Sequence, residues 1–122
     1  YRKLLKVLEN SKVDIYYRIT EYRLITYNLG LVEALNHDTS QACELFKQGM
    51  RTCMEAGRVS MIGRFLFAMG WTLSEAGEEK NKKKTCKMLQ QAFYISNILN
   101  QPNLNQNVQC YYQEKWDEFI KY

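Results

Sequence analysis

The sequence predicts an all-α fold built from antiparallel helix hairpins. Its 122 residues include one proline and six glycines, and residue types that favour helix are common throughout. Apolar residues recur every three or four positions in consecutive segments, and only short polar turns separate these segments. Short connections force consecutive helices to pair antiparallel. The spacing of small and large residues also repeats along the chain, which predicts about two and a half copies of one hairpin.

Length and composition indicate one globular domain over residues 1–122. Single domains usually contain about 100–150 residues. A hydrophobic content of 46% with 25% charged residues is too apolar for a disordered chain. The chain begins at Tyr1 rather than at a methionine and ends at Tyr122 inside an amphipathic segment. We therefore expect it to be a fragment of a longer protein.

The first predicted helices precede a turn at residues 36–38. Residues 1–10 have the pattern of a short amphipathic helix that would end a preceding repeat, and its apolar face is Leu4, Leu5 and Leu8. A long helix is expected from Val13 to about Leu35. Its inward positions are Ile15, Ile19, Tyr22, Ile25, Leu29 and Val32.

The second long helix is predicted to begin directly after this turn. Asp38 and Gln41 have the spacing of a capping box, in which the first side chain accepts a hydrogen bond from the backbone of the later residue. Gly57 can adopt the left-handed backbone conformation that commonly ends a helix. The predicted buried stripe is Ala42, Leu45, Phe46, Gly49, Met50 and Cys53.

Three more helices are expected beyond Gly57. The third runs from about Arg58 to Ala76 and stops at Gly77, and its inward residues are Ile62, Phe65, Leu66, Met69 and Leu73. The fourth covers about residues 81–100, and its seam is Met88, Leu89, Ala92, Phe93, Ser96 and Leu99. Pro102 can start the fifth, because the missing N–H costs nothing in the first turn. The inner side of this last helix is Val108, Tyr112, Trp116, Phe119 and Ile120.

An internal repeat is the most informative feature of the sequence. Ala42, Phe46 and Gly49 are spaced by four and three residues, and the same spacing returns 43 residues later at Thr85, Leu89 and Ala92. In the preceding helices, Gly30 and Gly70 lie 40 residues apart, and Cys110 lies 40 residues beyond Gly70. The pattern indicates that helix pairs are repeated.

This pattern resembles the tetratricopeptide repeat, in which small residues let the first helix of a pair approach the second. The tetratricopeptide period is about 34 residues, whereas the period here is 40 to 43, with an insertion of about three residues in Glu78–Lys84. The chain is similar to a divergent group, the peptide-sensing regulators of Gram-positive bacteria and their phages of the Rap, PlcR and Rgg type, and especially the arbitrium receptors of Bacillus phages. The similar segments are SQACELFKQGMRTCMEAG, GRFLFAMGWTLSEAG and MLQQAFYISNILNQPNLNQNVQCYYQEKW.

The resemblance implies a right-handed superhelix whose first helices line a groove for an extended signalling peptide. Members of this group generally join the scaffold to an N-terminal helix-turn-helix or to a helical effector domain. These 122 residues contain neither, so DNA binding and phosphatase action are not assigned to this segment.

Candidate site residues lie near the repeated glycine positions, on the faces that would line such a groove. They are Asn28, Arg58, Arg64, Phe67, Trp71, Asn107 and Tyr111. Aromatic anchors combined with amide and guanidinium donors suit a peptide backbone and a carboxylate. Ordinary structural roles remain open for the same residues: exposed asparagines, arginines in surface ion pairs, and a tryptophan that fills a repeat interface.

Metal binding and catalysis have little support in the sequence. The cysteines Cys43, Cys53, Cys86 and Cys110 form no C-x-x-C pair, so we expect no metal site and no cofactor. Three of them lie among apolar residues, as reduced thiols do, which indicates a cytoplasmic protein. His37 is the single histidine, and no catalytic triad, paired-carboxylate motif or phosphate-binding loop occurs. We expect no enzyme activity.

Membranes and nucleic acids are also disfavoured as partners. No stretch approaches the roughly 20 apolar residues that span a bilayer, and no signal-like leader opens the chain. The net charge is +4, and the one lysine cluster, at residues 80–84, follows two glutamates as a solvated helix start would. We expect no direct nucleic-acid contact from this segment, although an accessory module that uses the lysines stays a lesser alternative.

Two functions therefore compete. In the first, a short signalling peptide enters the groove and changes the curvature of the superhelix, which alters a DNA-binding or effector domain elsewhere. In the second, the chain is a constitutive protein-interaction or dimerisation scaffold, and its tyrosine-rich ends supply the interface, as in a homodimer.

Overall fold

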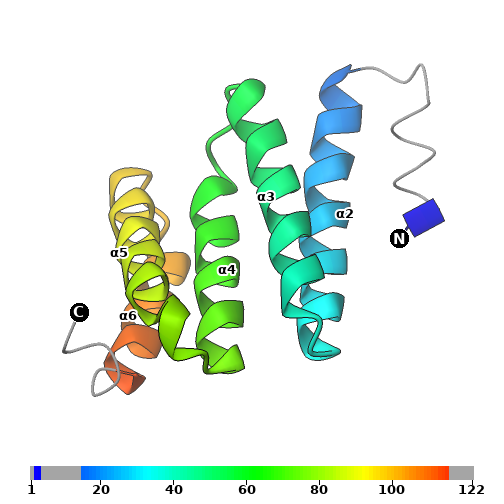
Figure 1. Cartoon of the computed structure of the whole chain (residues 1–122). Helices are drawn as coiled ribbons and strands as arrows, with labels where there is room; N and C mark the ends of the chain where they lie inside the picture. The colour runs from blue at the N-terminus through cyan, green and yellow to red at the C-terminus, as the bar shows by residue number, and fades with distance from the viewer. Residues whose placement is uncertain (1, 4–14, 116–122) are drawn as a thin grey trace. The chain divides into compact units, whose positions relative to one another are not determined.

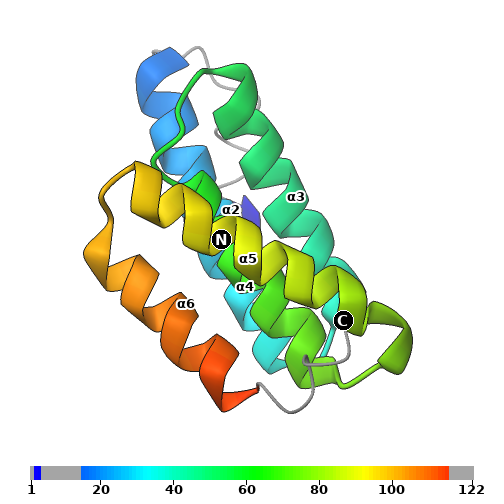
Figure 2. The ribbon, with the colours of Figure 1, turned by 90° about the vertical axis from the view of Figure 1, so that its left-hand side faces the viewer.

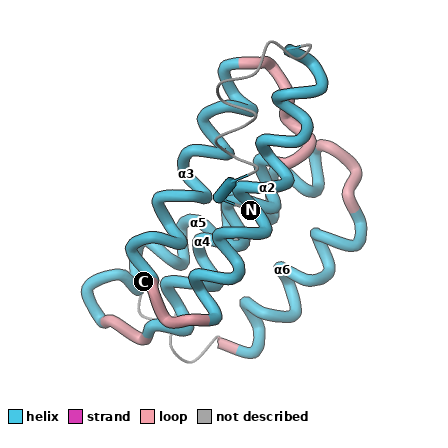
Figure 3. Tube along the Cα trace, turned by 90° about the vertical axis from the view of Figure 1, so that its right-hand side faces the viewer, coloured by secondary structure: helices cyan, strands magenta, loops and turns pink. Residues whose placement is uncertain are grey.

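The computed structural model describes residues 2–3 and 15–115, and the side chains of residues 2–3 and 22–115. All described elements are helices joined by turns, which confirms the all-α prediction (Figures 1 and 3). They are the α-helices α2 (Ile15–Leu35), α3 (Thr39–Glu55), α4 (Ile62–Ala76), α5 (Lys82–Ile98) and α6 (Pro102–Glu114), and the 3₁₀ helix η1 (Glu79–Asn81). The predicted helix at residues 1–10 and the positions Trp116, Phe119 and Ile120 lie outside the described residues.

The chain divides into two compact units, residues 1–61 and residues 62–122. The first contains the hairpin of α2 and α3, and the second contains the hairpin of α4 and α5 followed by α6. The expectation of one domain over residues 1–122 stays a prediction. Within the part of the chain that the structure describes, no helix combines the length and the apolar character that a bilayer crossing requires.

The turn between α2 and α3 is formed by local hydrogen bonds. His37 has a φ of 65°, and the N–H of Asp38 donates to the carbonyl of Glu33 at 2.9 Å, which closes α2. The Asp38 side chain then accepts from the backbone N–H of Gln41 at 3.2 Å and caps α3. Only one half of the predicted capping box forms, because the Asp38 N–H is already bonded to Glu33.

Replacing Asp38 with alanine is expected to lower the free energy of unfolding by about 1 kcal/mol, because the Gln41 N–H loses its acceptor. Urea denaturation followed by circular dichroism measures the change. Glu44→Ala is a suitable control, since Glu44 is exposed on the same helix and surface changes stay within about 0.5 kcal/mol. Equal stability of the two variants would contradict a capping role for Asp38.

The core of the first unit centres on Gly30 and Phe46. A Cβ placed on Gly30 would lie 2.5 Å from Cε1 of Phe46, and Phe46 is fully buried. The predicted stripe of α3 is confirmed except for Met50, which is only half-buried. The inward prediction for Val32 is wrong, since this side chain is 44% exposed. The buried face of α2 is centred between Thr26 and Leu29, and Val32 lies about 90° around the helix from that centre.

The end of α3 corrects the predicted start of the next helix. Gly57 has a φ of 70°, its N–H donates to the Met54 carbonyl at 3.1 Å, and the Arg58 N–H donates to the Cys53 carbonyl at 2.8 Å. These two bonds form a Schellman motif. Because the Arg58 backbone closes α3, it cannot start the next helix, and α4 begins only at Ile62.

In the second unit, α4 and α5 pack through the equivalent glycine. A Cβ on Gly70 would lie 3.0 Å from Cδ2 of Leu89, so the positions that the repeat relates to Gly30 and Phe46 also meet. Gly77, with a φ of 72°, follows the end of α4 as predicted. Four of the five predicted inward residues of α4 are buried, and Ile62 is half-buried.

The last two helices differ slightly from their predicted ranges. α5 ends at Ile98 because Asn100 adopts a φ of 54° and the Gln101 N–H donates to the Ser96 carbonyl at 2.8 Å. Within its seam, Leu89, Ala92 and Ser96 are buried, and the other three residues are half-buried. Pro102 occupies the first turn of α6, as predicted. Figure 2 shows α5 and α6 lying side by side.

Candidate functional site

The seven predicted site residues divide between the two units. Asn28 is half-buried on α2, and Arg58 is half-buried in the turn after α3. The other five lie in the second unit. Arg64 is exposed on α4, where Phe67 and Trp71 follow at spacings of three and four residues and are half-buried. Trp71 is therefore not part of the fully buried core.

Of the predicted residues, Phe67 and Tyr111 are brought into direct contact. Their rings meet edge to face with centroids 6.1 Å apart, which joins α4 to α6. The Tyr111 hydroxyl donates to a Glu75 carboxylate oxygen at 2.7 Å, and the Lys115 ammonium lies 3.8 Å from the same oxygen. Asn107 is exposed on the same helix as Tyr111. The Tyr111 hydroxyl on α6 is therefore already hydrogen-bonded to Glu75 on α4.

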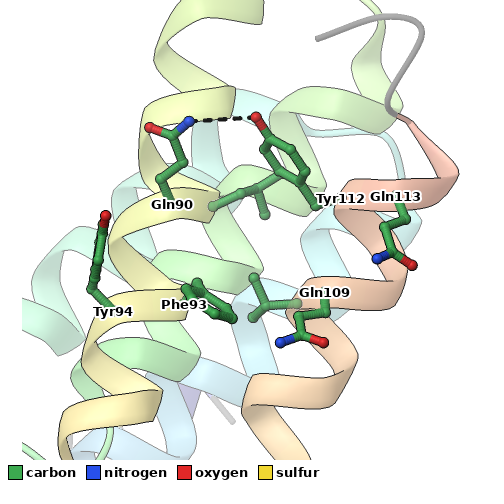
Figure 4. Close-up of a pocket in the computed structure, with 8 residues that line it drawn as sticks. Gln90, Phe93, Tyr94, Gln109, Tyr112 and Gln113 are labelled. Atoms are coloured by element: carbon green, nitrogen blue, oxygen red, sulfur yellow. Dashed lines mark hydrogen bonds between the residues drawn. The ribbon is translucent and has the colours of Figure 1, made fainter. Parts of the chain in front are cut away.

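A groove lies between α5 and α6 in the second unit (Figure 4). It is open to solvent and has a volume of about 390 Å³, within the range of ligand-binding clefts. Its walls come from both helices. The lining residues are Leu89, Gln90, Phe93, Tyr94, Val108, Gln109, Tyr112 and Gln113.

A small polar cluster of Cys86, Gln90 and Tyr112 lies at one end of this groove. The Gln90 amide donates to the Tyr112 hydroxyl at 3.4 Å, and this hydroxyl lies 3.2 Å from the Cys86 sulfur. Burial raises the pKa of Tyr112, and the hydrogen bond with Cys86 raises it further, while that with Gln90 lowers it. At neutral pH the Tyr112 phenol therefore keeps its proton.

A second, polar groove continues from the first. It has a volume of about 370 Å³, and Gln109 lines both grooves. Amide side chains such as Asn97, Asn105 and Gln106 dominate its walls. The Gln109 amide donates to Asn105 Oδ1 at 3.3 Å, and Asn105 in turn donates to Ser96 Oγ at 3.1 Å. Amide groups therefore form a continuous row from one groove to the other.

The chemistry of these two grooves is that of an uncharged hydrogen-bonding surface. None of their lining residues is an aspartate, glutamate, lysine, arginine or histidine. Side-chain amides donate and accept at once, and the aromatic rings offer flat apolar contacts. Among the described residues, no group of three or more His, Cys, Asp or Glu side chains is placed to hold a metal ion.

No protein family matches this chain, and neither does any curated protein or solved structure. The resemblance to peptide-sensing regulators thus rests on the sequence segments alone. What the grooves bind has to be inferred from their lining residues.

Sequence reasoning gave no role to four of the eight residues that line the main groove. It placed Leu89, Phe93, Val108 and Tyr112 on inward faces but assigned nothing to Gln90, Tyr94, Gln109 and Gln113. A signal was present, since amides recur at every fourth residue of α6, at Asn105, Gln109 and Gln113. Residues four apart share one helix face. Such a row of amides on one face marks a polar stripe that apolar periodicity does not detect.

Proposed function

We propose that this chain is a non-catalytic, tetratricopeptide-like helical repeat that binds a short extended peptide in the groove between α5 and α6. The observation that carries the proposal is the lining of this groove, where glutamine side chains alternate with exposed faces of Phe93, Tyr94 and Tyr112. Its larger role would be that of the peptide-responsive regulators that the sequence resembles.

The amide groups suit the backbone of an extended peptide. Each peptide unit presents one N–H and one C=O, and a glutamine side chain can pair with both. Gln113 is exposed at the rim on α6, and Gln90 lies across the groove on α5. An extended strand between the two helices can therefore bond to both walls while its side chains contact the rings.

The absence of ionised groups from the lining predicts the type of peptide. A charged ligand side chain would lose hydration in the groove without gaining an opposite charge among the lining residues. Peptides with apolar, aromatic or amide side chains avoid this cost. We expect the preferred ligands to be uncharged over the residues that contact the groove.

Selection of peptides from a phage-displayed library of random linear hexamers, followed by calorimetric titration, tests the proposal. Gln109→Glu and Gln113→Glu are each expected to weaken the selected peptide at least tenfold, or about 1.4 kcal/mol, because each places a carboxylate beside the peptide carbonyls. Gln91→Glu is the matched control: it makes the same change at an exposed position of α5 outside the groove and should leave the affinity unchanged.

Other outcomes would relocate or reject the site. If Arg64→Ala, Trp71→Ala or Asn107→Ala abolishes binding while the groove variants do not, the face predicted from the sequence is the binding surface. If the library yields no peptide, or if Gln91→Glu weakens binding as much as Gln113→Glu, the groove is not a peptide site.

A constitutive interaction scaffold is the second candidate, and one observation favours it. Tyr94 and Ile98 are four residues apart on α5 and are 65% and 79% exposed. Two large apolar side chains on one helix face suit a protein interface. Sedimentation equilibrium would then find a dimer that Ile98→Glu dissociates. A monomer at all concentrations would exclude self-association through this face.

A further inference from the structure

The polar groove that continues from the main groove differs from it in the character of its walls. Six of its eight lining residues are asparagine or glutamine, whereas five of the eight that line the main groove are apolar or aromatic. Gln109 lines both grooves, so the walls change from aromatic to amide at this residue. A ligand that lies in the main groove and continues past Gln109 therefore enters a different chemical environment.

The row of amides on α6 has nearly the spacing of an extended peptide. Asn105, Gln109 and Gln113 are four residues apart, so successive amides are separated by about 6 Å along the helix. Figure 4 shows Gln109 and Gln113 on successive turns of α6. In an extended strand, the backbone groups on one edge recur at every second residue, about 6.6–6.8 Å apart. Each turn of α6 can therefore offer one amide to every second residue of a peptide that runs along it.

The combined length of the two grooves sets the length of the ligand. Their lining on α6 extends from Pro102 to Gln113, which is about 16 Å along the helix axis. An extended peptide covers that distance in about five residues. A peptide of five or six residues therefore reaches from the aromatic rings of the main groove into the polar groove.

Hydrogen bonds hold Asn105 in place in the wall of the polar groove. Its amide donates to the Ser96 hydroxyl at 3.1 Å and to the Phe93 carbonyl at 3.4 Å, which ties α6 to α5. Its oxygen accepts from the Gln109 amide at 3.3 Å and has a second lone pair. This bond uses one of the two N–H donors of Gln109. Because the row is positioned before a ligand arrives, little conformational entropy is lost when a ligand bonds to it.

The helix ends at the polar groove favour a neutral group over an ion. Asn97 belongs to the last turn of α5, Pro102 belongs to the first turn of α6, and both line this groove. The carbonyl end of a helix disfavours anions, and the N–H end disfavours cations. With both ends present, neither sign of charge is preferred. A side-chain amide is neutral, and it donates and accepts at once, as the amides of the wall do.

We propose that the polar groove binds the side-chain amide of an asparagine or glutamine at one end of the bound peptide. This inference rests on the proposed peptide site and adds a sequence preference to it: apolar or aromatic residues in the main groove, then an amide residue beyond Gln109. A carboxylate at that position would lose hydration without meeting a cation among the lining residues, and a leucine would leave polar groups of the wall unbonded. Both replacements are therefore disfavoured.

Selection of random linear hexamers on the whole chain tests this preference, and the readout is the residue frequency at each peptide position. We expect asparagine or glutamine to be enriched at one end of the selected peptides, and apolar or aromatic residues at the positions beside it. The best peptide is then synthesised with leucine in place of that amide residue. In calorimetric titration this analogue should bind the wild-type chain roughly tenfold or more weakly, because it loses its hydrogen bonds to the wall.

Substitutions in the wall assign the preference to the polar groove. Asn105→Leu and Gln106→Leu each remove an amide that lines this groove and not the main groove. In both variants the amide peptide and its leucine analogue should bind with affinities within about twofold of each other, since the amide loses its partner. Gln106 is exposed, so its variant serves if Asn105→Leu fails to fold. Asn103→Leu is the matched control, at an exposed asparagine of α6 that lines neither groove, and should keep the full difference between the peptides.

The outcomes separate this inference from the proposed function. Selected peptides without an amide preference, or a leucine analogue that binds the wild-type chain as tightly as its parent, would overturn the amide subsite and leave the main groove as a peptide site. A difference between the two peptides that persists in both Asn105→Leu and Gln106→Leu would also overturn the subsite. If the library yields no peptide, the proposed function fails and the subsite fails with it.

Discussion

Replacing Gly30 with alanine is expected to lower the free energy of unfolding of the first hairpin by about 1–3 kcal/mol, the usual cost of overpacking a core. The new methyl group would lie 2.5 Å from Cε1, and 2.8 Å from Cδ1 and Cζ, of the Phe46 ring. This ring is fully buried and its neighbours leave it little room to move. The steric cost should exceed the gain of about 1 kcal/mol that alanine brings in helix propensity.

Gly70→Ala is the matched comparison for this substitution. Its methyl group would lie 3.0 Å from Cδ2 of Leu89, the end of a flexible aliphatic side chain. A small rotation relieves that contact, so Gly70→Ala should cost clearly less than Gly30→Ala or nothing. Urea denaturation of both variants measures the difference.

A double-mutant cycle identifies the cause of the Gly30 effect. Phe46→Leu gives the first hairpin the glycine and leucine pair that the second hairpin has naturally. In that background Gly30→Ala should lose most of its cost, with a coupling energy above about 0.5 kcal/mol. A Gly30→Ala variant as stable as the wild type would show that helix propensity, not ring contact, decides the outcome.

The features that sequence reasoning predicted well are local or repeated. Asp38, Gly57 and Pro102 act within one helical turn of their own position, so their chemistry is visible without tertiary structure. The meeting of Gly30 with Phe46 was predictable because the same pair of positions recurs one period later. Close packing of two helices requires a small residue opposite a large one, and this requirement appears in the sequence as a repeated spacing.

The predictions for Arg58 and Val32 were wrong because the sequence around each residue fits more than one local structure. Arg58 follows a glycine and precedes an apolar segment, which suits a helix start, but its N–H is used to close the preceding helix. Val32 fits an apolar spacing on α2, yet it lies outside the buried face, which consists of Ile25, Thr26, Leu29 and Gly30. In both cases a hydrogen bond or a contact with another helix decided between two acceptable local patterns.

The groove between α5 and α6 could not be predicted for a different reason. It forms between α5, the second helix of a hairpin, and α6, the helix that follows it, whereas the resemblance drew attention to the first helices of the predicted pairs alone. Its polar walls follow no apolar period, and the Gln90, Tyr112 and Cys86 contacts join positions up to 26 residues apart. Arg23 and Ser60, 37 residues apart, are likewise paired only by tertiary structure.

Leu89 connects the stability of the second unit to the groove. It is fully buried, packs near Gly70 of α4, and clusters with Cys86 against Phe67 and two tyrosines of α6. The same side chain also lines the groove. A change in its volume should therefore alter both the hairpin core and the surface offered to a ligand.

Leu89→Ala is expected to lower the free energy of unfolding by about 2–5 kcal/mol, because it removes buried methyl groups and leaves a cavity. Urea denaturation gives the stability, and Leu89→Met, which nearly conserves volume, should cost less than about 1.5 kcal/mol. Ile98→Ala on the exposed side of α5 should stay within about 0.5 kcal/mol. Below the unfolding transition, Leu89→Ala should also weaken any peptide selected for the groove, since Leu89 lines this groove together with Phe93 and Tyr112. Unchanged peptide affinity in a fully folded Leu89→Ala variant would place the bound peptide away from Leu89.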